Sequence, residues 1–168
     1  FSNVIVFNIG EYYPLAEGAP GTMSLLKELL LDKVNIDPEN IHSPGKLVSK
    51  EDVYQYCKNY EEEIEACGGI DLALCEIGAV GNLAFNEPGS SLSSRTRVKT
   101  LTTDTIIANS RFFDNDVNKV PKTSVTVGVG TVLDAKEVLI MVNGHNKARA
   151  LAQVIEGSVN QMWTITAL

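Results

Sequence analysis

Two hydrophobic patterns alternate along the chain. Short apolar runs rich in β-branched residues have the composition of strands buried on both faces, and they cover 3–7, 70–75, 123–127 and 137–142. Apolar residues at helical spacing predict helices over 22–34, 49–67 and 146–156. A last strand is expected over 163–168. Strands that alternate with helices predict right-handed βαβ units, and therefore an α/β chain with a mostly parallel sheet.

The second helix has the clearest pattern. Ser49 and Asp52 form a Ser-x-x-Asp start signal, and Gly68-Gly69 ends the pattern. Its apolar side chains are expected on one face, namely Val53, Cys57, Tyr60 and Ile64.

The carboxyl ends of the predicted strands indicate where a ligand site should lie. In parallel sheets ligands bind outside the carboxyl ends of the strands. Three segments leave those ends, namely 8–11, 76–88 and 143–147. We expect any ligand site to be built from these loops.

Composition narrows the class of protein. The 168 residues fit one domain spanning 1–168, with an apolar fraction of 44% and no run long enough to cross a membrane. A formal net charge of −7 disfavours nucleic acid as a partner. Three cysteines without metal-ligand spacing favour reduced thiols and an intracellular setting.

Two segments could bind an anion. Six of the fourteen cationic side chains lie between positions 95 and 122, and Arg97 shares a face with Arg95 or Lys99 if the segment is extended. Surface ion pairs explain this cluster equally well. Gly144-His-Asn-Lys147 joins a strand to a helix, where backbone N–H groups favour an anion, although glycine and lysine are also common there.

The remaining motifs give little support for a specific function. Gly128-Val-Gly130 lacks the third glycine of a dinucleotide fingerprint, so it predicts tight packing instead. His42 lies in an expected surface loop, whereas His145 follows a strand end. Neither histidine belongs to a zinc or nucleophile motif, so protease, zinc and thiol-redox functions are unsupported.

Four segments together resemble the glucosamine-6-phosphate deaminase (isomerase) family over essentially the whole chain. They read "VIVFNIGEYYPL", "GAVGNLAFNEPGSSLSSRTRVKTLT", "ANSRFFDNDVNKVPKTSVTVGVGT" and "VNQMWTITAL". "AFNEP" with "SSRTR" and "NSRFFDND" distinguishes the chain from the related phosphogluconolactonases. The resemblance implies a three-layer α/β/α, Rossmann-like fold. The family's first strand and phosphate-holding loop precede the first of these segments, and its lid and tail follow the last, so we expect a single domain truncated at both ends.

The resemblance also implies an activity. Family members convert glucosamine 6-phosphate to fructose 6-phosphate and ammonia by general acid–base catalysis, without a metal or organic cofactor. Three positions that carry the family's proton-transferring groups are altered here. The base aspartate falls on Gly10, the loop aspartate on Val80 and the histidine on Asn82. Only Glu87, the partner of that histidine, is kept.

The positions that bind phosphate are intact. The resemblance assigns substrate-phosphate contacts to Arg111 and Lys147. It assigns the phosphate contacts of an allosteric site for N-acetylglucosamine 6-phosphate to Ser90, Arg97 and Lys99. The implied partner is an amino-sugar phosphate, either glucosamine 6-phosphate or its N-acetylated form. Family members act in the cytoplasm in amino-sugar catabolism and are commonly oligomers, so a cytoplasmic homo-oligomer is consistent with the resemblance.

Three hypotheses follow. The first is a deaminase-like domain that binds an amino-sugar phosphate with its catalysis lost or strongly impaired. The second is a sugar-phosphate sensor or regulatory module of a multidomain protein. The third is an active isomerase or deaminase of altered specificity that uses Glu87. Glu11 is an unsuitable substitute base because adjacent side chains on a strand face opposite ways, which leaves His145 as the better substitute.

Overall fold

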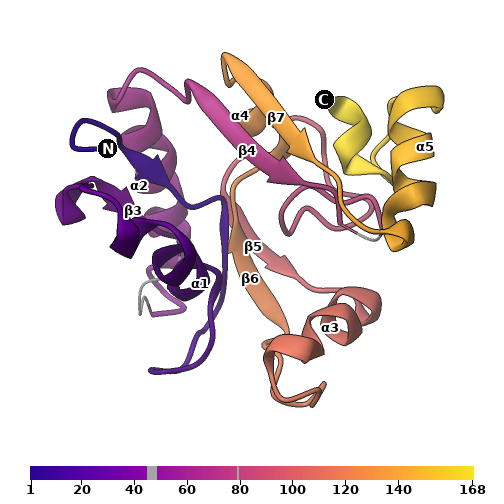
Figure 1. Cartoon of the computed structure of the whole chain (residues 1–168), viewed down its shortest axis with the longest axis horizontal. Helices are drawn as coiled ribbons and strands as arrows, with labels where there is room; N and C mark the ends of the chain where they lie inside the picture. Colours follow the sequence, from indigo (N-terminus) through magenta and orange to yellow (C-terminus); the bar gives the residue numbers. More distant parts are fainter. Residues whose placement is uncertain (45–48, 79) are drawn as a thin grey trace.

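The computed structural model describes residues 1–44, 49–78 and 80–168. Its helices are α1 (Thr22–Leu29), α2 (Val53–Ala66), α3 (Thr103–Asn109), α4 (Val129–Leu133) and α5 (Ala148–Glu156). Its strands are β1 (Val6–Phe7), β2 (Gly10–Tyr12), β3 (Ile41–His42), β4 (Leu72–Glu76), β5 (Arg97–Thr100), β6 (Thr123–Thr126) and β7 (Glu137–Met141). Figure 1 shows β4 and β7 side by side between α2 and α5.

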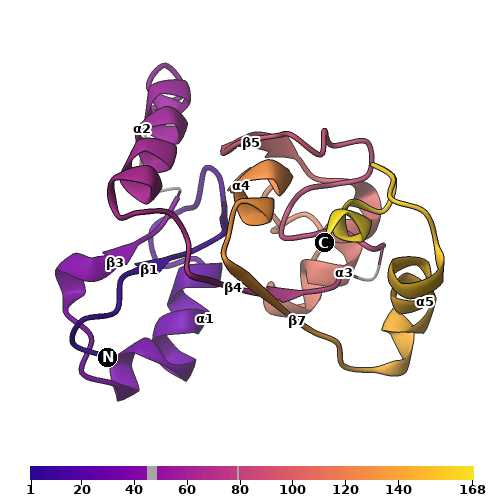
Figure 2. The same ribbon diagram turned by 90° about the horizontal axis from the view of Figure 1, so that it is seen from above.

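The strands form three small sheets. β1 pairs with β3 and β4 pairs with β7, and both pairs are parallel as predicted. β6 lies between β2 and β5 and is antiparallel to both. Viewed from above, α1, α2 and β3 lie on one side of β4 and β7, and α3 and α5 lie on the other (Figure 2). The sequence did not predict β2 as a strand, because its three residues are too few to give a periodic pattern.

Helix α2 confirms the periodicity prediction. Its buried residues are Val53, Cys57, Tyr60 and Ile64. Gly68 and Gly69, which follow the helix, both have a left-handed φ, near +88° and +84°. That conformation favours glycine, so these two residues end the helix where the sequence predicted.

The β4–β7 pair is covered on one face only. Along β4, Ala73 and Cys75 are buried at 3% and 1% exposure, whereas Leu72 and Leu74 are about half exposed at 50% and 51%. On the same face of β7, Leu139 lies opposite Leu74 and is 51% exposed. The prediction that these strands are buried on both faces was therefore wrong for the described residues, because no described element packs over the leucines.

The predicted strand over 163–168 is instead a 3-10 turn, η5 (Thr164–Ala167). Side-chain hydrogen bonds explain the difference. The Thr166 hydroxyl donates to the carbonyl of Trp163 at 2.6 Å, and the Thr164 hydroxyl donates to the carbonyl of Asn86 at 2.9 Å. The first of these bonds is local and offers the backbone an alternative to a strand ladder, whereas the second ties the turn to a distant loop. Ile165 between them is fully buried and joins the main core.

Gly128 and Gly130 confirm the prediction of tight packing. A Cβ atom on Gly128 would lie 1.9 Å from the carbonyl oxygen of Ser94. The N–H of Gly130 donates to the same carbonyl at 3.0 Å. These contacts bring the start of α4 against the segment that leads into β5. Among the described residues, no helix is long and apolar enough to cross a membrane.

Candidate functional site

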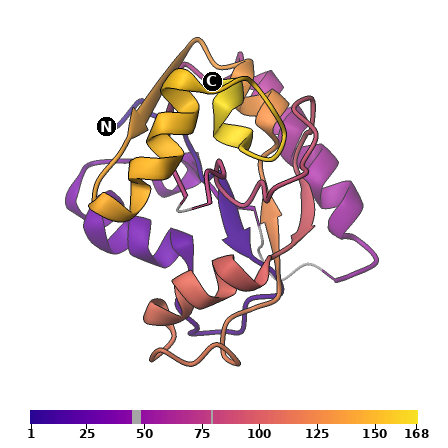
Figure 3. The same cartoon turned by 90° about the vertical axis from the view of Figure 1, so that its right-hand side faces the viewer.

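A cavity of about 550 Å³ lies at the strand ends. All three loops predicted to build a ligand site contribute to it, through Asn8 to Gly10, through Glu76, Gly78, Val80 and Asn82, and through Asn143, Asn146 and Lys147. The three loops thus meet at one cavity, as the strand order predicts, and ligand binding there stays a prediction. Helices α1 and α3 complete the wall. Figure 3 shows these two helices, in purple and salmon, below the gold helix α5.

The cavity brings together five of the residues singled out from the sequence. They are Gly10, Val80, Asn82, Arg111 and Lys147. Glu87, Ser90, Arg97 and Lys99 are not among the described residues that line it. The three altered positions and the two cations of the candidate phosphate site thus share one space, while the remaining positions lie beside it.

The space next to Gly10 is filled by an aromatic ring. A Cβ atom on Gly10 would lie 2.8 Å from Cδ2 of Phe85. Phe85 is 8% exposed and packs against Tyr12, with ring centroids 5.3 Å apart. The substitution at position 10 is therefore accompanied by packing that leaves little room for a side chain.

Asn82 is held by its own loop. Its side-chain amide donates to the carbonyl of Ala84 at 2.7 Å, and the residue is 8% exposed. A Cβ atom on Gly78 would lie 1.7 Å from Oδ1 of Asn82, so this close approach requires glycine. An amide can donate and accept hydrogen bonds, but it does not titrate near neutral pH.

Glu87 is not among the described lining residues and is 2% exposed. Its carboxylate accepts hydrogen bonds from the backbone N–H of Thr102 at 3.3 Å and from the Thr102 hydroxyl at 3.2 Å. Thr102 is the N-cap of α3. In this structure Glu87 fastens the start of α3 to the loop that carries Asn82.

Arg111 and Lys147, the two candidate phosphate-binding residues, differ in exposure and in ion pairing. The Arg111 guanidinium is exposed and lies over the Phe112 ring, 4.7 Å from its centroid. Among the described carboxylates, none lies within ion-pair distance of it. The Lys147 side chain is only 12% exposed and pairs with Glu76 Oε1 at 3.1 Å. Its ammonium also donates to the carbonyl of Ile77.

The sequence did not predict the role of α3. Asp104, Thr105, Ala108 and Asn109 line the cavity, although this short segment lacks a clear apolar period. Burial raises the pKa of the nearby Tyr12 phenol to about 12, and the charge of Glu11 adds to the shift. Hydrogen bonding to Asn109 and the charge of Arg111 act against it. Tyr12 is therefore a neutral phenol in the cavity wall at physiological pH.

The residues proposed for a second phosphate site lie beside Glu87. The Ser90 hydroxyl donates to the Glu87 carbonyl at 2.7 Å. Arg97 and Lys99 alternate along β5, which confirms that they share a face. Nη1 of Arg97 donates to Asn86 Oδ1 at 2.9 Å, whereas its buried Nη2 has no partner among the described residues. Burial lowers the pKa of this guanidinium below its usual range.

Glu11 has a structural role. Its carboxylate accepts three backbone N–H bonds of 2.9 Å, from Tyr12, Thr22 and Met23. Two of these donors belong to the first turn of α1, where a negative charge also interacts well with the helix dipole. Glu11 is therefore engaged by backbone donors, as expected for a side chain that faces away from the neighbouring Gly10 position.

We expect Glu11→Gln to lower the free energy of unfolding by about 2 kcal/mol, because an amide offers one acceptor oxygen and loses the charge that strengthens these bonds. Urea denaturation measures the change. Glu17→Gln, on an exposed residue, is the matched control and should change stability by less than about 0.5 kcal/mol. Equal effects of the two substitutions would contradict this role for Glu11.

Neither histidine lies in the cavity wall. His42 stacks on Phe7, with centroids 4.4 Å apart, and pairs with Glu63 at 3.1 Å. His145 is exposed at the first position of η4 (His145–Lys147) and is not among the lining residues. The structure therefore gives no support to His145 as a substitute base.

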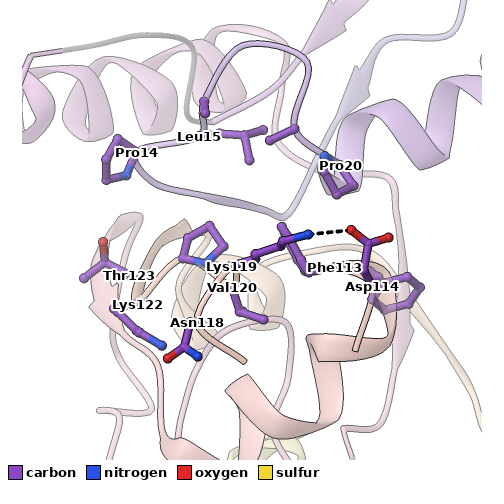
Figure 4. A pocket seen from close by; sticks show the side chains of 14 residues that line it. Pro14, Leu15, Pro20, Phe113, Asp114, Asn118, Lys119, Val120, Lys122 and Thr123 are labelled. Atoms are coloured by element: carbon purple, nitrogen blue, oxygen red, sulfur yellow. Dashed lines mark hydrogen bonds and ion pairs between the residues drawn. The ribbon is translucent and has the colours of Figure 1, made fainter. Parts of the chain in front are cut away.

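A second cavity, of about 650 Å³, lies between the loop after β2 and the segment from Phe112 to Thr123. Figure 4 shows Pro14, Leu15 and Pro20 on one side and Val120 on the other, with the ion pair of Lys119 and Asp114 spanning 2.8 Å. Lys119 and Lys122 of the cationic cluster line it, but among the described residues it contains none of the positions that the family resemblance assigns to catalysis or phosphate binding. We therefore assign the candidate site to the smaller cavity.

Comparison with known proteins gives the same family as the sequence motifs. The model of the glucosamine-6-phosphate isomerases/6-phosphogluconolactonase family matches residues 1–167. A glucosamine-6-phosphate deaminase of Parabacteroides distasonis is 64% identical over all of this chain, and one of Phocaeicola vulgatus is 59% identical. The chain spans 62% and 64% of the length of these two relatives.

Solved structures confirm the three-layer α/β/α fold. A monomeric glucosamine-6-phosphate deaminase superposes with a TM-score of 0.94 at 31% identity, covering all of this chain and 69% of that protein. A 6-phosphogluconolactonase from Thermotoga maritima superposes with a TM-score of 0.70 at 20% identity, covering 97% of this chain and 68% of that protein, which shows a shared fold. The chain belongs to the glucosamine-6-phosphate isomerase/6-phosphogluconolactonase family.

Proposed function

We propose that this chain is an amino-sugar phosphate-binding domain of the deaminase type, in which acid–base catalysis is lost or strongly impaired. The observation that carries the proposal is the shared cavity. Arg111 and Lys147 stand in its wall together with Gly10, Val80 and Asn82. The cations supply a site for phosphate, whereas a glycine, a valine and an amide stand where the family resemblance places proton-transferring groups.

Binding should depend on Arg111. We expect Arg111→Ala to weaken binding of glucosamine 6-phosphate by about 10- to 100-fold, because a charge-assisted hydrogen bond to phosphate contributes roughly 1.5–3 kcal/mol. Isothermal titration calorimetry of the whole chain measures the change.

Arg95→Ala is the matched control, because Arg95 pairs with Asp134 at 2.6 Å and does not line the cavity. It should bind like the unaltered chain. No heat with glucosamine 6-phosphate or N-acetylglucosamine 6-phosphate at millimolar concentration would overturn the proposal and leave a structural role.

Two alternatives remain as proposals. A sensor or regulatory module would bind the same ligands without turnover, and Gly10, Val80 and Asn82, which cannot transfer a proton, support it equally. An active enzyme that relies on Glu87 is less well supported, since Glu87 is 2% exposed and bonded to Thr102.

A second phosphate site at Ser90, Arg97 and Lys99 is also part of the proposal. The unpartnered Nη2 of Arg97 supports it, because a buried guanidinium nitrogen favours an acceptor. The half-exposed leucines of β4 and β7 support a homo-oligomer. We place the domain in the cytoplasm and in amino-sugar catabolism by analogy with the family.

A further inference from the structure

Two carboxylates in the cavity wall, Glu76 and Asp104, do not suit a phosphate site, and Glu76 is the one that pairs with a candidate phosphate-binding cation. Its carboxylate lines the same wall as Lys147 and pairs with the ammonium at 3.1 Å. An anion that enters the cavity therefore meets a lysine that is already paired with a carboxylate. The sequence did not single out Glu76, because it is the last residue of a strand with no motif of its own.

The strand register explains why Glu76 points to the cavity. Side chains alternate along β4, so Cys75 enters the core at 1% exposure and Glu76 takes the opposite face. As the last residue of β4, Glu76 stands at the strand end where the cavity opens. Its side chain is 64% exposed, so solvent reaches the carboxylate while Lys147 stays 12% exposed.

From this arrangement we propose that Glu76 is an internal competitor for the candidate phosphate site, which occupies Lys147 and lowers the affinity of the cavity for anions according to their charge. This inference rests on the proposed function. A phosphate dianion must either displace the Glu76 carboxylate or bind beside it, and like charges at such distances repel. Glu76 thereby sets which anions the cavity accepts.

Removing the charge should strengthen binding. We expect Glu76→Gln to bind glucose 6-phosphate about tenfold more tightly than the unaltered chain at pH 8, where the phosphate is a dianion. Glucose 6-sulfate carries a single negative charge, so its gain should be smaller, about threefold. Both are measured by calorimetry on the whole chain.

Glu137→Gln provides the matched control. Glu137 is the first residue of β7 and lies opposite Leu72, at the far end of the ladder from the pair of Glu76 and Met141. Its substitution changes the net charge by the same amount outside the cavity. It should alter either affinity by less than twofold.

The outcomes separate this inference from the proposed function. Unchanged affinity in Glu76→Gln, with binding still weakened by Arg111→Ala, would overturn the inference alone. Equal gains for the phosphate and sulfate esters would overturn it as well, because the effect would then not depend on the charge of the ligand. Failure of both the unaltered chain and Glu76→Gln to bind any sugar phosphate would overturn both. A charge-dependent gain confined to Glu76→Gln supports the inference.

Discussion

Ammonia release from glucosamine 6-phosphate by this chain is expected to be at least about 10⁴-fold slower than by a family enzyme that carries the two aspartates and the histidine. General acid–base groups each contribute roughly 10²–10⁴-fold, and groups that act as a unit are not additive. Gly10, Val80 and Asn82 cannot transfer a proton. The remaining Glu87 is turned toward Thr102.

A coupled assay for ammonia, run with saturating substrate, measures this difference. Glu87→Gln is the informative comparison, because any residual turnover that disappears with it would favour an altered enzyme that uses this carboxylate. Turnover within about tenfold of an ordinary family member would contradict the loss of catalysis.

An aspartate side chain at position 10 would have too little space beside Phe85. Phe85 stands 2.8 Å from the place of the missing Cβ atom, so the ring must move before a carboxylate fits. Because Phe85 also packs on Tyr12, that movement would disturb the cavity wall. An aspartate at position 10 would therefore require a shift of Phe85 and of the Tyr12 ring on which it packs.

The second large effect concerns Gly81, in the loop between Val80 and Asn82. Gly81 has a φ near +74°, and a Cβ atom there would lie 2.1 Å from Cε3 of Trp163. We expect Gly81→Ala to lower the free energy of unfolding by about 3 kcal/mol, of which about 1 kcal/mol reflects the left-handed backbone and the rest the displaced indole.

Gly68→Ala isolates the backbone contribution. Gly68 has a similar φ near +88°, but no atom lies within 4 Å of the place of its Cβ. Its cost should stay near 1 kcal/mol. Trp163 is the only tryptophan in the chain, so its fluorescence reports the indole directly during urea denaturation. Equal costs, or an unchanged emission spectrum in Gly81→Ala, would contradict the contact.

The sequence predicted the elements with strong periodicity. The sequence correctly predicted the buried face of α2 and the three loops that line the cavity. A long helical period leaves few alternative buried faces, and the strand order determines which loops meet at the strand ends. The prediction failed at 163–168, where two threonine hydroxyls bond to backbone carbonyls and form a 3-10 turn. One of these bonds depends on Asn86, a partner that is distant in sequence.

The sequence motifs predicted which residues belong to the candidate site, but they did not predict the contacts between its side chains. Gly10, Val80, Asn82, Arg111 and Lys147 were named from the sequence and share one cavity. The pairing of Lys147 with Glu76 and the packing of Phe85 against Gly10 were missed. Both arise from side-chain directions that are set by strand register and loop path, which no local pattern encodes.

The half-exposed leucines of β4 and β7 affect how stability varies with temperature. The heat capacity of unfolding is large because unfolding newly hydrates apolar surface. Leu72, Leu74 and Leu139 already meet water in the folded chain, so they add little to that change. Each of them therefore adds only about half of the apolar area that a fully buried leucine would add to the heat capacity and to the urea slope of unfolding, unless a partner covers that face.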